Sequence, residues 1–391
     1  MQPDMIHRPL WAEIHLDHLE HNLKQIRMHI RPETTICAVI KANGYGHGAV
    51  RLAKEMENIG IDHLAVATLN EALELRNHHC TLPILVLGYT PDEKAPLLIE
   101  NNLKQTVYTK EQAKVISEAA KKVGKTACLH IKIDTGMSRL GFQPTIETVE
   151  AITEITGYSH LFVEGIYTHY ATADESDKQQ ALQQFEKYQW VIEQLTLRKC
   201  DIPLLHTANS AAIIDLPQTH LNMVRAGIMM YGLYPSPDVN QKDIRLKRVM
   251  SLKTRVAHVK EILPGTGVSY GLTFRAAKNM KIATLPVGYA DGYTRLLGGK
   301  AEVSVNGIKA PVIGRICMDQ CMIDVTDIDV NQGDEVVLYA LSPEIGDTVD
   351  DVARMLGTIN YEITCMVSRR VPRVYLREGK IIDAWDPLLD V

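Results

Sequence analysis

Eight short runs of apolar and β-branched residues alternate with helix-like segments in the first part of the chain. The clearest helical segment is Lys110–Gly124, which opens with the capping pair Thr109 and Gln112 and ends at a glycine. Strands that alternate with helices pair in parallel, and continuously apolar strands are typical of sheets covered on both faces. The runs are Thr34–Lys41, His63–Thr68, Pro83–Tyr89, Lys104–Thr109, Ala127–Thr135, Leu161–Tyr170, Pro203–Asn209 and Met223–Tyr231.

Eight parallel strands are the number that closes a (β/α)8 barrel. An open doubly wound sheet would give the same alternation. A dinucleotide-binding sheet would carry Gly-x-Gly-x-x-Gly after its first strand, but here Lys41-Ala42-Asn43-Gly44-Tyr45-Gly46-His47-Gly48 follows. The sequence therefore favours a TIM-like barrel over the open sheet.

The pattern changes after Leu246 to strands of period two, with an Asn306-Gly307 hairpin signal and one short helix at Thr348–Leu356. Closing strands are expected near Ile363–Val367 and Val371–Leu376. We predict an α/β plus β protein, with a barrel over residues 1–245 and a mostly antiparallel β domain over 246–391. The first 15 or so residues are expected to pack with the second domain.

Composition excludes several classes of protein. Among 391 residues, 42 are basic and 47 acidic, a net charge of −5 with both signs interleaved, so neither nucleic acid nor a membrane surface is an expected partner. No apolar run is long enough to span a bilayer, and Asp4 and Pro9 interrupt the start where a signal peptide would be apolar. Seven scattered cysteines lack the spacing of a disulfide scaffold or a zinc site. We expect a cytoplasmic protein with reduced thiols.

Polar residues at the carboxyl ends of the expected strands indicate where function lies in such a barrel. They form a cationic group without a carboxylate pair or metal-ligand spacing, which suits an anionic ligand such as a phosphate ester. Lys41 at the end of an apolar strand would be a nucleophilic amine, or a lysine that reaches solvent at the barrel rim. Arg225 could equally be a structural ion-pair partner of Glu164. The group comprises Lys41, Arg139, His169, Ser210 and Arg225.

Motifs along almost the whole chain resemble those of bacterial alanine racemases of the barrel type. Their order and number make the resemblance specific. They are Ala38–Gly48, His130–Gly141, Thr168–Asp174, His206–Ser210, Val224–Ile228, Gly267–Gly271, Gly288–Gly292, Gly314–Gln320 and Asn360–Glu362.

The resemblance implies that Lys41 holds pyridoxal 5′-phosphate covalently and acts as the base on the D-face of alanine, with Tyr270 as the base on the L-face. Racemisation needs a base on each side of a planar carbon, and a phenol near pKa 10 needs help to act as one. Family members supply that help through a network that includes Arg225, which faces the pyridine nitrogen. The implied residues around the cofactor are His169 and His206 in the network, and Tyr45, Ser210, Gly227, Ile228 and Tyr361 at the phosphate.

Substrate recognition is implied for Arg139, which would be oriented by a carbamylated Lys132. A bare ammonium in an apolar strand is costly, so Lys132 is expected to be modified or paired with Asp134. Tyr361 and Met318 would close the pocket around the methyl group of alanine. Supporting and gate residues are expected at Asp174, Tyr289, Arg295, Arg315, Cys317 and Asp319.

The resemblance also implies a head-to-tail homodimer with shared active sites, because Tyr270 and Met318 lie in the β domain and Lys41 in the barrel. The expected product is D-alanine for peptidoglycan. Two alternatives remain open from the residues: a decarboxylase of the same architecture, which would use a reactive cysteine and an acidic partner of the pyridine nitrogen, and a non-catalytic cofactor carrier, which would lack the β domain.

Overall fold

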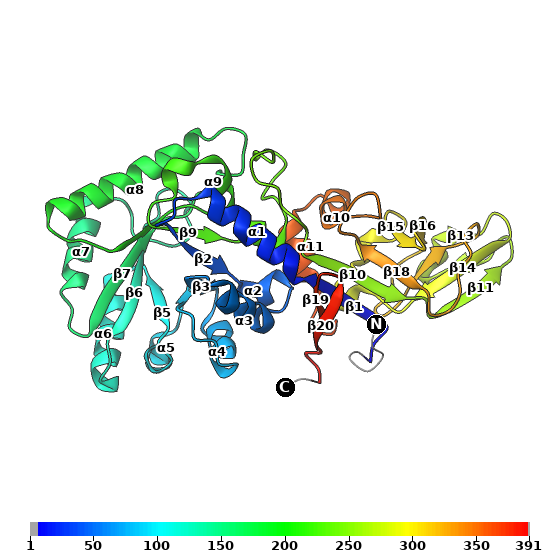
Figure 1. Ribbon diagram of the computed structural model, residues 1–391, viewed down its shortest axis with the longest axis horizontal. Helices are drawn as coiled ribbons and strands as arrows, with labels where there is room; N and C mark the ends of the chain where they lie inside the picture. Colours follow the sequence, from blue (N-terminus) through cyan, green and yellow to red (C-terminus); the bar gives the residue numbers. More distant parts are fainter. Residues whose placement is uncertain (1–6, 390–391) are drawn as a thin grey trace.

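The computed structural model describes residues 7–389 and consists of a barrel joined to a second, flatter sheet (Figure 1). The barrel strands are all parallel and have the order β8-β7-β6-β5-β4-β3-β2-β9. Backbone bonds from Asn222 N to Leu205 O (3.1 Å) and from Arg225 N to Ala208 O (3.0 Å) join the last two strands. The strands are β2 (Thr35–Val39), β3 (His63–Val66), β4 (Ile84–Val86), β5 (Lys104–Val107), β6 (Ala127–Lys132), β7 (Leu161–Tyr167), β8 (Leu204–His206) and β9 (Met223–Ala226).

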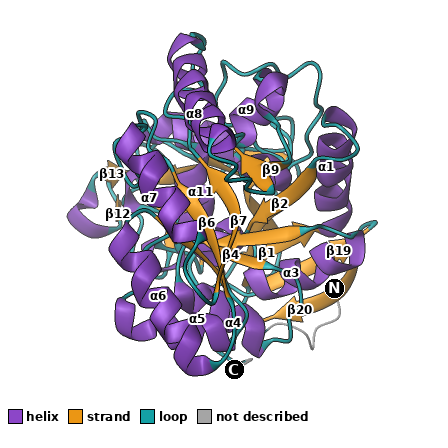
Figure 2. Cartoon of the chain, turned by 90° about the vertical axis from the view of Figure 1, so that its left-hand side faces the viewer, coloured by secondary structure: helices purple, strands orange, loops and turns teal. Residues whose placement is uncertain are grey.

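Helices surround the barrel strands, as the view from the barrel end shows (Figure 2). Local sequence sets their ends: Thr109 Oγ1 accepts Gln112 N at 3.2 Å, and Gly124 ends the helix at a φ of 74°. The Gln112 side chain faces Tyr108 N instead of completing the predicted capping pair. The helices are α1 (Leu16–His29), α2 (Lys41–Tyr45), α3 (Ala49–Ile59), α4 (Leu69–Asn77), α5 (Ala95–Glu100), α6 (Lys110–Val123), α7 (Ile146–Thr156), α8 (Gln179–Leu197) and α9 (Ser210–Asp215).

The second sheet is antiparallel except where β1 (Leu10–His15) runs parallel to β19 (Arg373–Arg377). Its order is β11-β14-β17-β16-β15-β18-β10-β1-β19-β20, so the N-terminal strand lies inside it. The other strands are β10 (Met250–Arg255), β11 (His258–Ile262), β14 (Met280–Leu285), β15 (Glu302–Val305), β16 (Ile308–Ile313), β17 (Cys321–Asp324), β18 (Glu335–Tyr339) and β20 (Lys380–Trp385), with β12 (Gly267–Val268) and β13 (Phe274–Arg275) as a separate pair.

The predicted fold class is therefore confirmed, with one local correction in the second part. The expected strand at Ile363–Val367 is wrong: the segment lies in α11 (Asn360–Met366), where Asn360, Ile363 and Thr364 form one buried helical face. Packing on this face overrides the β-propensity of the branched residues. The expected helix is present as α10 (Val349–Leu356).

We keep the division at residues 245 and 246 as a proposal for the domain boundary. Residues 232–249 contain neither helix nor strand and connect β9 to β10. Because β1 belongs to the second sheet, the chain enters the barrel only after Leu16.

Candidate active site

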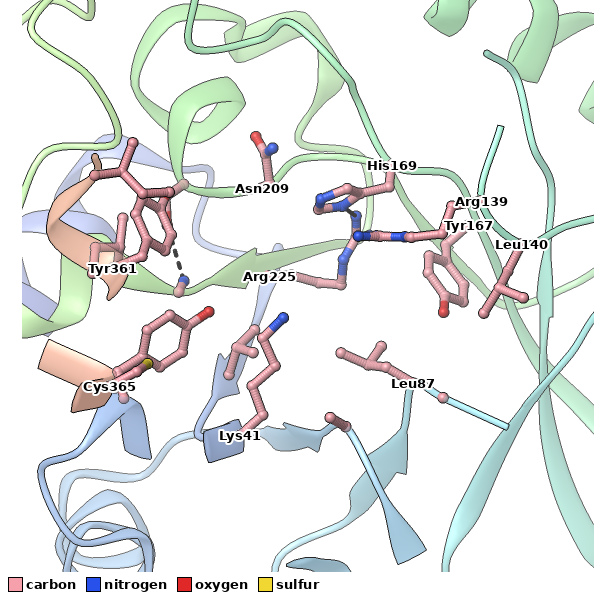
Figure 3. Close-up of a pocket in the computed structure, with 18 of the residues that line it drawn as sticks. Lys41, Leu87, Arg139, Leu140, Tyr167, His169, Asn209, Arg225, Tyr361 and Cys365 are labelled. Carbon is pink, nitrogen blue, oxygen red and sulfur yellow. Dashed lines mark hydrogen bonds between the residues drawn. The ribbon is translucent and has the colours of Figure 1, made fainter. Parts of the chain in front are cut away.

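A cavity of about 600 Å³ lies where the barrel strands end and is closed on one side by α11 (Figure 3). Its walls are cationic and aromatic, with Leu87, Leu140 and Ile359 as apolar parts. Ten of the residues predicted from the sequence line it: Lys41, Tyr45, Lys132, Arg139, His169, Ser210, Arg225, Gly227, Ile228 and Tyr361.

Lys41 follows β2 and directs its amine into this cavity (Figure 3). Burial, and then the nearby charge of Arg139, lower the pKa of the Lys41 amine from its usual value. Within residues 7–389 the amine has no hydrogen-bond or ion-pair partner. It is thus a partly desolvated amine that is free to react with a ligand in the cavity.

Neutral donors form an anion cradle after the last barrel strand. Ser210 Oγ accepts Gly227 N at 3.0 Å, and the 3₁₀ turn Ile228–Tyr231 begins here. A Cβ on Gly227 would lie 3.1 Å from Tyr45 Oη and 3.4 Å from Ser210 Oγ, so the absent side chain leaves the space between these groups open. Burial raises the pKa of Tyr45 and of Tyr361, which keeps both phenols protonated as donors.

Arg225 is buried beside this cradle and is held by acceptors other than carboxylates. It donates to His206 Nδ1 (3.0 Å), His206 O (3.1 Å), Thr168 O (2.8 Å) and Thr207 O (3.0 Å), and His169 Nδ1 lies at 3.4 Å. The expected alternative of an Arg225–Glu164 ion pair is wrong, because Glu164 pairs with Lys104 and His130. In the part of the chain described, Arg225 Nε makes no hydrogen bond, so it remains available at the cavity wall.

A chain of hydrogen bonds leads from Arg225 through the barrel interior and fixes two histidine tautomers. Because a guanidinium only donates, His206 Nδ1 must accept, so the His206 proton is on Nε2. His206 Nε2 then donates to His130 Nδ1 at 2.9 Å, and His130 Nε2 donates to Glu164 Oε2 at 2.9 Å. Burial lowers the pKa of both histidines and keeps them neutral.

The charge at the far end of this chain is the Glu164 carboxylate. Burial acts to raise its pKa, but hydrogen bonds from His130 and Lys104 outweigh that effect and lower it to about 2. The carboxylate is therefore ionised, and it orients the histidines that in turn hold Arg225.

Lys132 is buried, and its amine donates to Ile133 O at 2.8 Å. The expected pairing with Asp134 is wrong, since the Asp134 oxygens accept the backbone amides of residues 136–139. Burial, and then the charge of Arg225, lower the pKa of Lys132 to about 7. The turn of residues 136–139, which Asp134 holds, also brings the guanidinium of Arg139 to the cavity (Figure 3).

The remaining predicted residues do not line the Lys41 cavity. Tyr270, Cys317, Met318 and Asp319 line a second hollow of about 450 Å³ in the β domain. Figure 1 shows β13, which follows Tyr270, at the opposite end of the molecule from the barrel. Arg315 lies against Gly271 beside this hollow, and Tyr289 is 43% exposed. Asp174 accepts Ser236 Oγ through its carbonyl, and Arg295 begins a short 3₁₀ helix.

Comparison with known proteins identifies the same family for both parts of the chain. The family models "Alanine racemase, N-terminal domain" and "Alanine racemase, C-terminal domain" match residues 14–235 and 249–375. Alanine racemase 1 of Clostridium acetobutylicum is 47% identical over 376 residues, 96% of this chain and 97% of that protein. The chain belongs to the alanine racemase family.

Solved structures of alanine racemases have the same fold. The enzyme of Clostridium difficile 630 matches with a TM-score of 0.95 at 46% identity, over 98% of this chain and 100% of that one. The Bacillus anthracis enzyme with bound L-Ala-P matches with a TM-score of 0.92 at 38% identity, over 99% and 100%. The chain is thus a racemase, and alanine racemases depend on pyridoxal 5′-phosphate.

Three observations show that the residues of the cavity fit pyridoxal 5′-phosphate. The cradle offers neutral donors to a phosphate, as barrel phosphate sites do. The Lys41 amine is unpartnered, and Arg225 Nε faces the cavity wall without a partner among residues 7–389. Within the same described range, no group of three His, Cys, Asp or Glu side chains could hold a metal ion, and no helix is long and apolar enough to cross a membrane.

Sequence reasoning missed several residues of this site. Ala67, Leu87 and Gly88 follow barrel strands, so their position after β3 and β4 could have identified them. Ile359 directly precedes α11, whereas Glu362 and Cys365 lie in it, and of these three only Cys365 falls in the segment expected to be a strand.

Proposed function

We propose that Lys41 and the partner subunit's Tyr270 are the two bases with which this chain interconverts L- and D-alanine, supplying D-alanine for peptidoglycan. The observation that carries the proposal is the unpartnered Lys41 amine in a cavity that also contains the anion cradle and Arg225. Bound pyridoxal 5′-phosphate withdraws electrons from the substrate and makes its Cα proton acidic.

The residues of the cavity divide the remaining work. Lys41 Nζ removes or returns the Cα proton on the D-face, and its lowered pKa leaves more of the amine neutral for this task. Tyr270 Oη does the same on the L-face. Arg225 would hold the pyridine nitrogen of the cofactor and, because a guanidinium does not readily give up a proton, would leave that nitrogen unprotonated, which would limit side reactions. Arg139 binds the substrate carboxylate.

The assignment requires a head-to-tail homodimer with shared active sites, which we also propose, because Lys41 and Tyr270 line separate hollows within the described chain. Large apolar side chains around the second hollow are exposed, as expected of a surface that a second copy covers. They include Tyr270 (68% exposed), Met318 (53%) and, two residues after Tyr270, Leu272 (49%). In such a dimer Met318 and Asp319 of one subunit, with Arg295, Arg315, Cys317 and Tyr289, would border the other subunit's cavity.

Alanine is the proposed substrate because Tyr361 and Met318 would leave room for a methyl group. An added hydroxyl or methylene changes discrimination by only about 1–3 kcal/mol, so serine is expected to be a weak substrate. A cytoplasmic location is also proposed, supported by seven cysteines that are all free in the described residues.

We further propose that Lys132 is carbamylated and orients Arg139. A pKa of about 7 leaves much of the amine neutral near neutral pH, the form that reacts with carbon dioxide. Mass spectrometry under native conditions should show an excess of one carbon dioxide per subunit that is absent from Lys132→Met. An unmodified wild-type subunit at ambient bicarbonate would contradict this proposal.

The function itself is tested with purified protein supplied with pyridoxal 5′-phosphate. L-alanine and D-alanine should each lose optical rotation until the mixture is racemic, without release of carbon dioxide. Borohydride reduction should then fix the cofactor covalently, and peptide mapping should locate it on Lys41. Colourless protein that leaves both enantiomers unchanged would contradict the proposal, and carbon dioxide release would favour a decarboxylase.

A further inference from the structure

The backbone that follows Lys41 is left-handed over four consecutive residues. Ala42, Asn43, Gly44 and Tyr45 have φ values of 51°, 54°, 62° and 51°, although only one of them is glycine. L-residues with a Cβ avoid this region because of steric conflict with the neighbouring carbonyl. The turn that carries the Lys41 amine is therefore strained and needs contacts from outside to persist.

One of those contacts is a carboxylate from a different helix. The Ala42 amide, the first after Lys41, donates to Glu71 Oε1 at 2.6 Å. Glu71 Oε2 accepts the amides of Ala67 at 2.7 Å and Thr68 at 3.2 Å. Both oxygens of this one carboxylate are therefore used, one by the Lys41 turn and the other by the start of α4.

The start of α4 fixes the direction of this carboxylate. Thr68 Oγ1 accepts Glu71 N at 3.3 Å, which completes a capping box. A capping box alone needs only the bond to the Thr68 amide. The additional bond to Ala42 connects the helix cap to the residue beside Lys41, 29 positions earlier in the chain.

Other side chains and backbone groups hold the rest of the turn, and among the described residues Glu71 provides the side-chain contact nearest to Lys41 in the sequence. Asn43 Oδ1 accepts Ala49 N at 2.9 Å, and Gly46 O accepts Arg373 Nε at 2.9 Å. These contacts secure the far side of the turn, whereas the Ala42 amide fixes the plane of the peptide that leaves Lys41.

We propose that Glu71 is a positioning residue that holds the left-handed turn after Lys41 and so aims the Lys41 amine at the reacting carbon. The inference rests on the proposed function of Lys41 as the D-face base. A carboxylate is required because three amides converge on its two oxygens, and the NH₂ group of a glutamine accepts no hydrogen bond.

The first test measures the tether on cofactor-free protein. In Glu71→Gln, hydrogen exchange at the Ala42 amide should become about 10–100-fold faster, as expected for the loss of a charge-assisted hydrogen bond. Thr68→Val is the matched control: it removes the capping hydroxyl but leaves the bond to Ala42, so the Ala42 amide should exchange as in the wild type. Equal exchange in wild type and Glu71→Gln would overturn the proposal.

The second test measures aim on the loaded enzyme. Glu71→Gln should lower kcat about tenfold with KM within about twofold, because only the position of the base changes. The isotope effect of Cα-deuterated D-alanine on kcat should rise, while that of L-alanine should not. Thr68→Val should keep wild-type values. A Glu71→Gln enzyme that matches Thr68→Val in kcat and isotope effects would overturn the proposal.

A second variant keeps the proposal testable if Glu71→Gln does not fold. Glu71→Asp keeps the charge and the helix cap but is one methylene too short to reach Ala42, so it should reproduce the faster exchange and lower kcat. Wild-type behaviour of Glu71→Asp would overturn the proposal. If the wild type does not racemise alanine, the proposed function fails, whereas the exchange measurement still judges the tether by itself.

Discussion

Lys41→Ala is expected to lower kcat for alanine racemisation at least about 10³-fold in both directions, because it removes both the cofactor attachment and one base. The remaining base should still act on one face. Slow exchange of the Cα hydrogen of L-alanine with deuterated water should persist, whereas exchange of D-alanine should be lost.

Tyr270→Phe should give the opposite result, with exchange retained for D-alanine and lost for L-alanine. Proton NMR of each enantiomer in deuterated water measures both. Lys110→Ala, which removes an exposed amine paired with Glu154, is the control and should leave kcat unchanged. Equal loss of exchange for both enantiomers in each variant would contradict a separate base on each face.

Mixing two inactive variants is expected to restore activity. In a head-to-tail dimer, a hybrid of Lys41→Ala and Tyr270→Ala subunits has one site with both defects and one site with neither. Random reassortment makes about half of the dimers hybrid, so about a quarter of wild-type activity should return.

Differently tagged subunits allow the hybrid to be isolated and its activity measured directly. Each variant carried through the same exchange procedure alone should stay inactive. An isolated hybrid without activity would contradict sharing of the site, because a chain that held both bases in one site would leave each site of the hybrid with one defect.

The local hydrophobic pattern predicts the barrel well because each barrel strand is buried on both faces and therefore consists mainly of apolar residues. Each of the eight apolar runs contains one barrel strand, although the last run ends in a 3₁₀ turn, and Gly124 ends its helix as its lack of a Cβ allows. The failure at Ile363–Val367 has the opposite cause. Those residues favour a strand by themselves, but they lie in α11, which packs against α10 and α2.

The candidate site divides in the same way. The position of Lys41 after a strand and the group around Arg225 follow from the order of strands. The partner of Arg225 does not, because Glu164, which the sequence allows as its ion-pair partner, contacts Lys104 and His130 instead. Nor does any local signal predict that Glu71 reaches the Ala42 amide, since a capping box is complete without it.

The place of β1 has a consequence for biosynthesis. Leu10–His15 is translated before both of its neighbours, since β10 and β19 span residues 250–255 and 373–377. The barrel strands between them can assemble while translation continues, whereas β1 keeps at least one open edge until residue 377 has been made. Synthesis of β19, and not closure of the barrel, therefore sets the earliest moment at which both edges of β1 are paired.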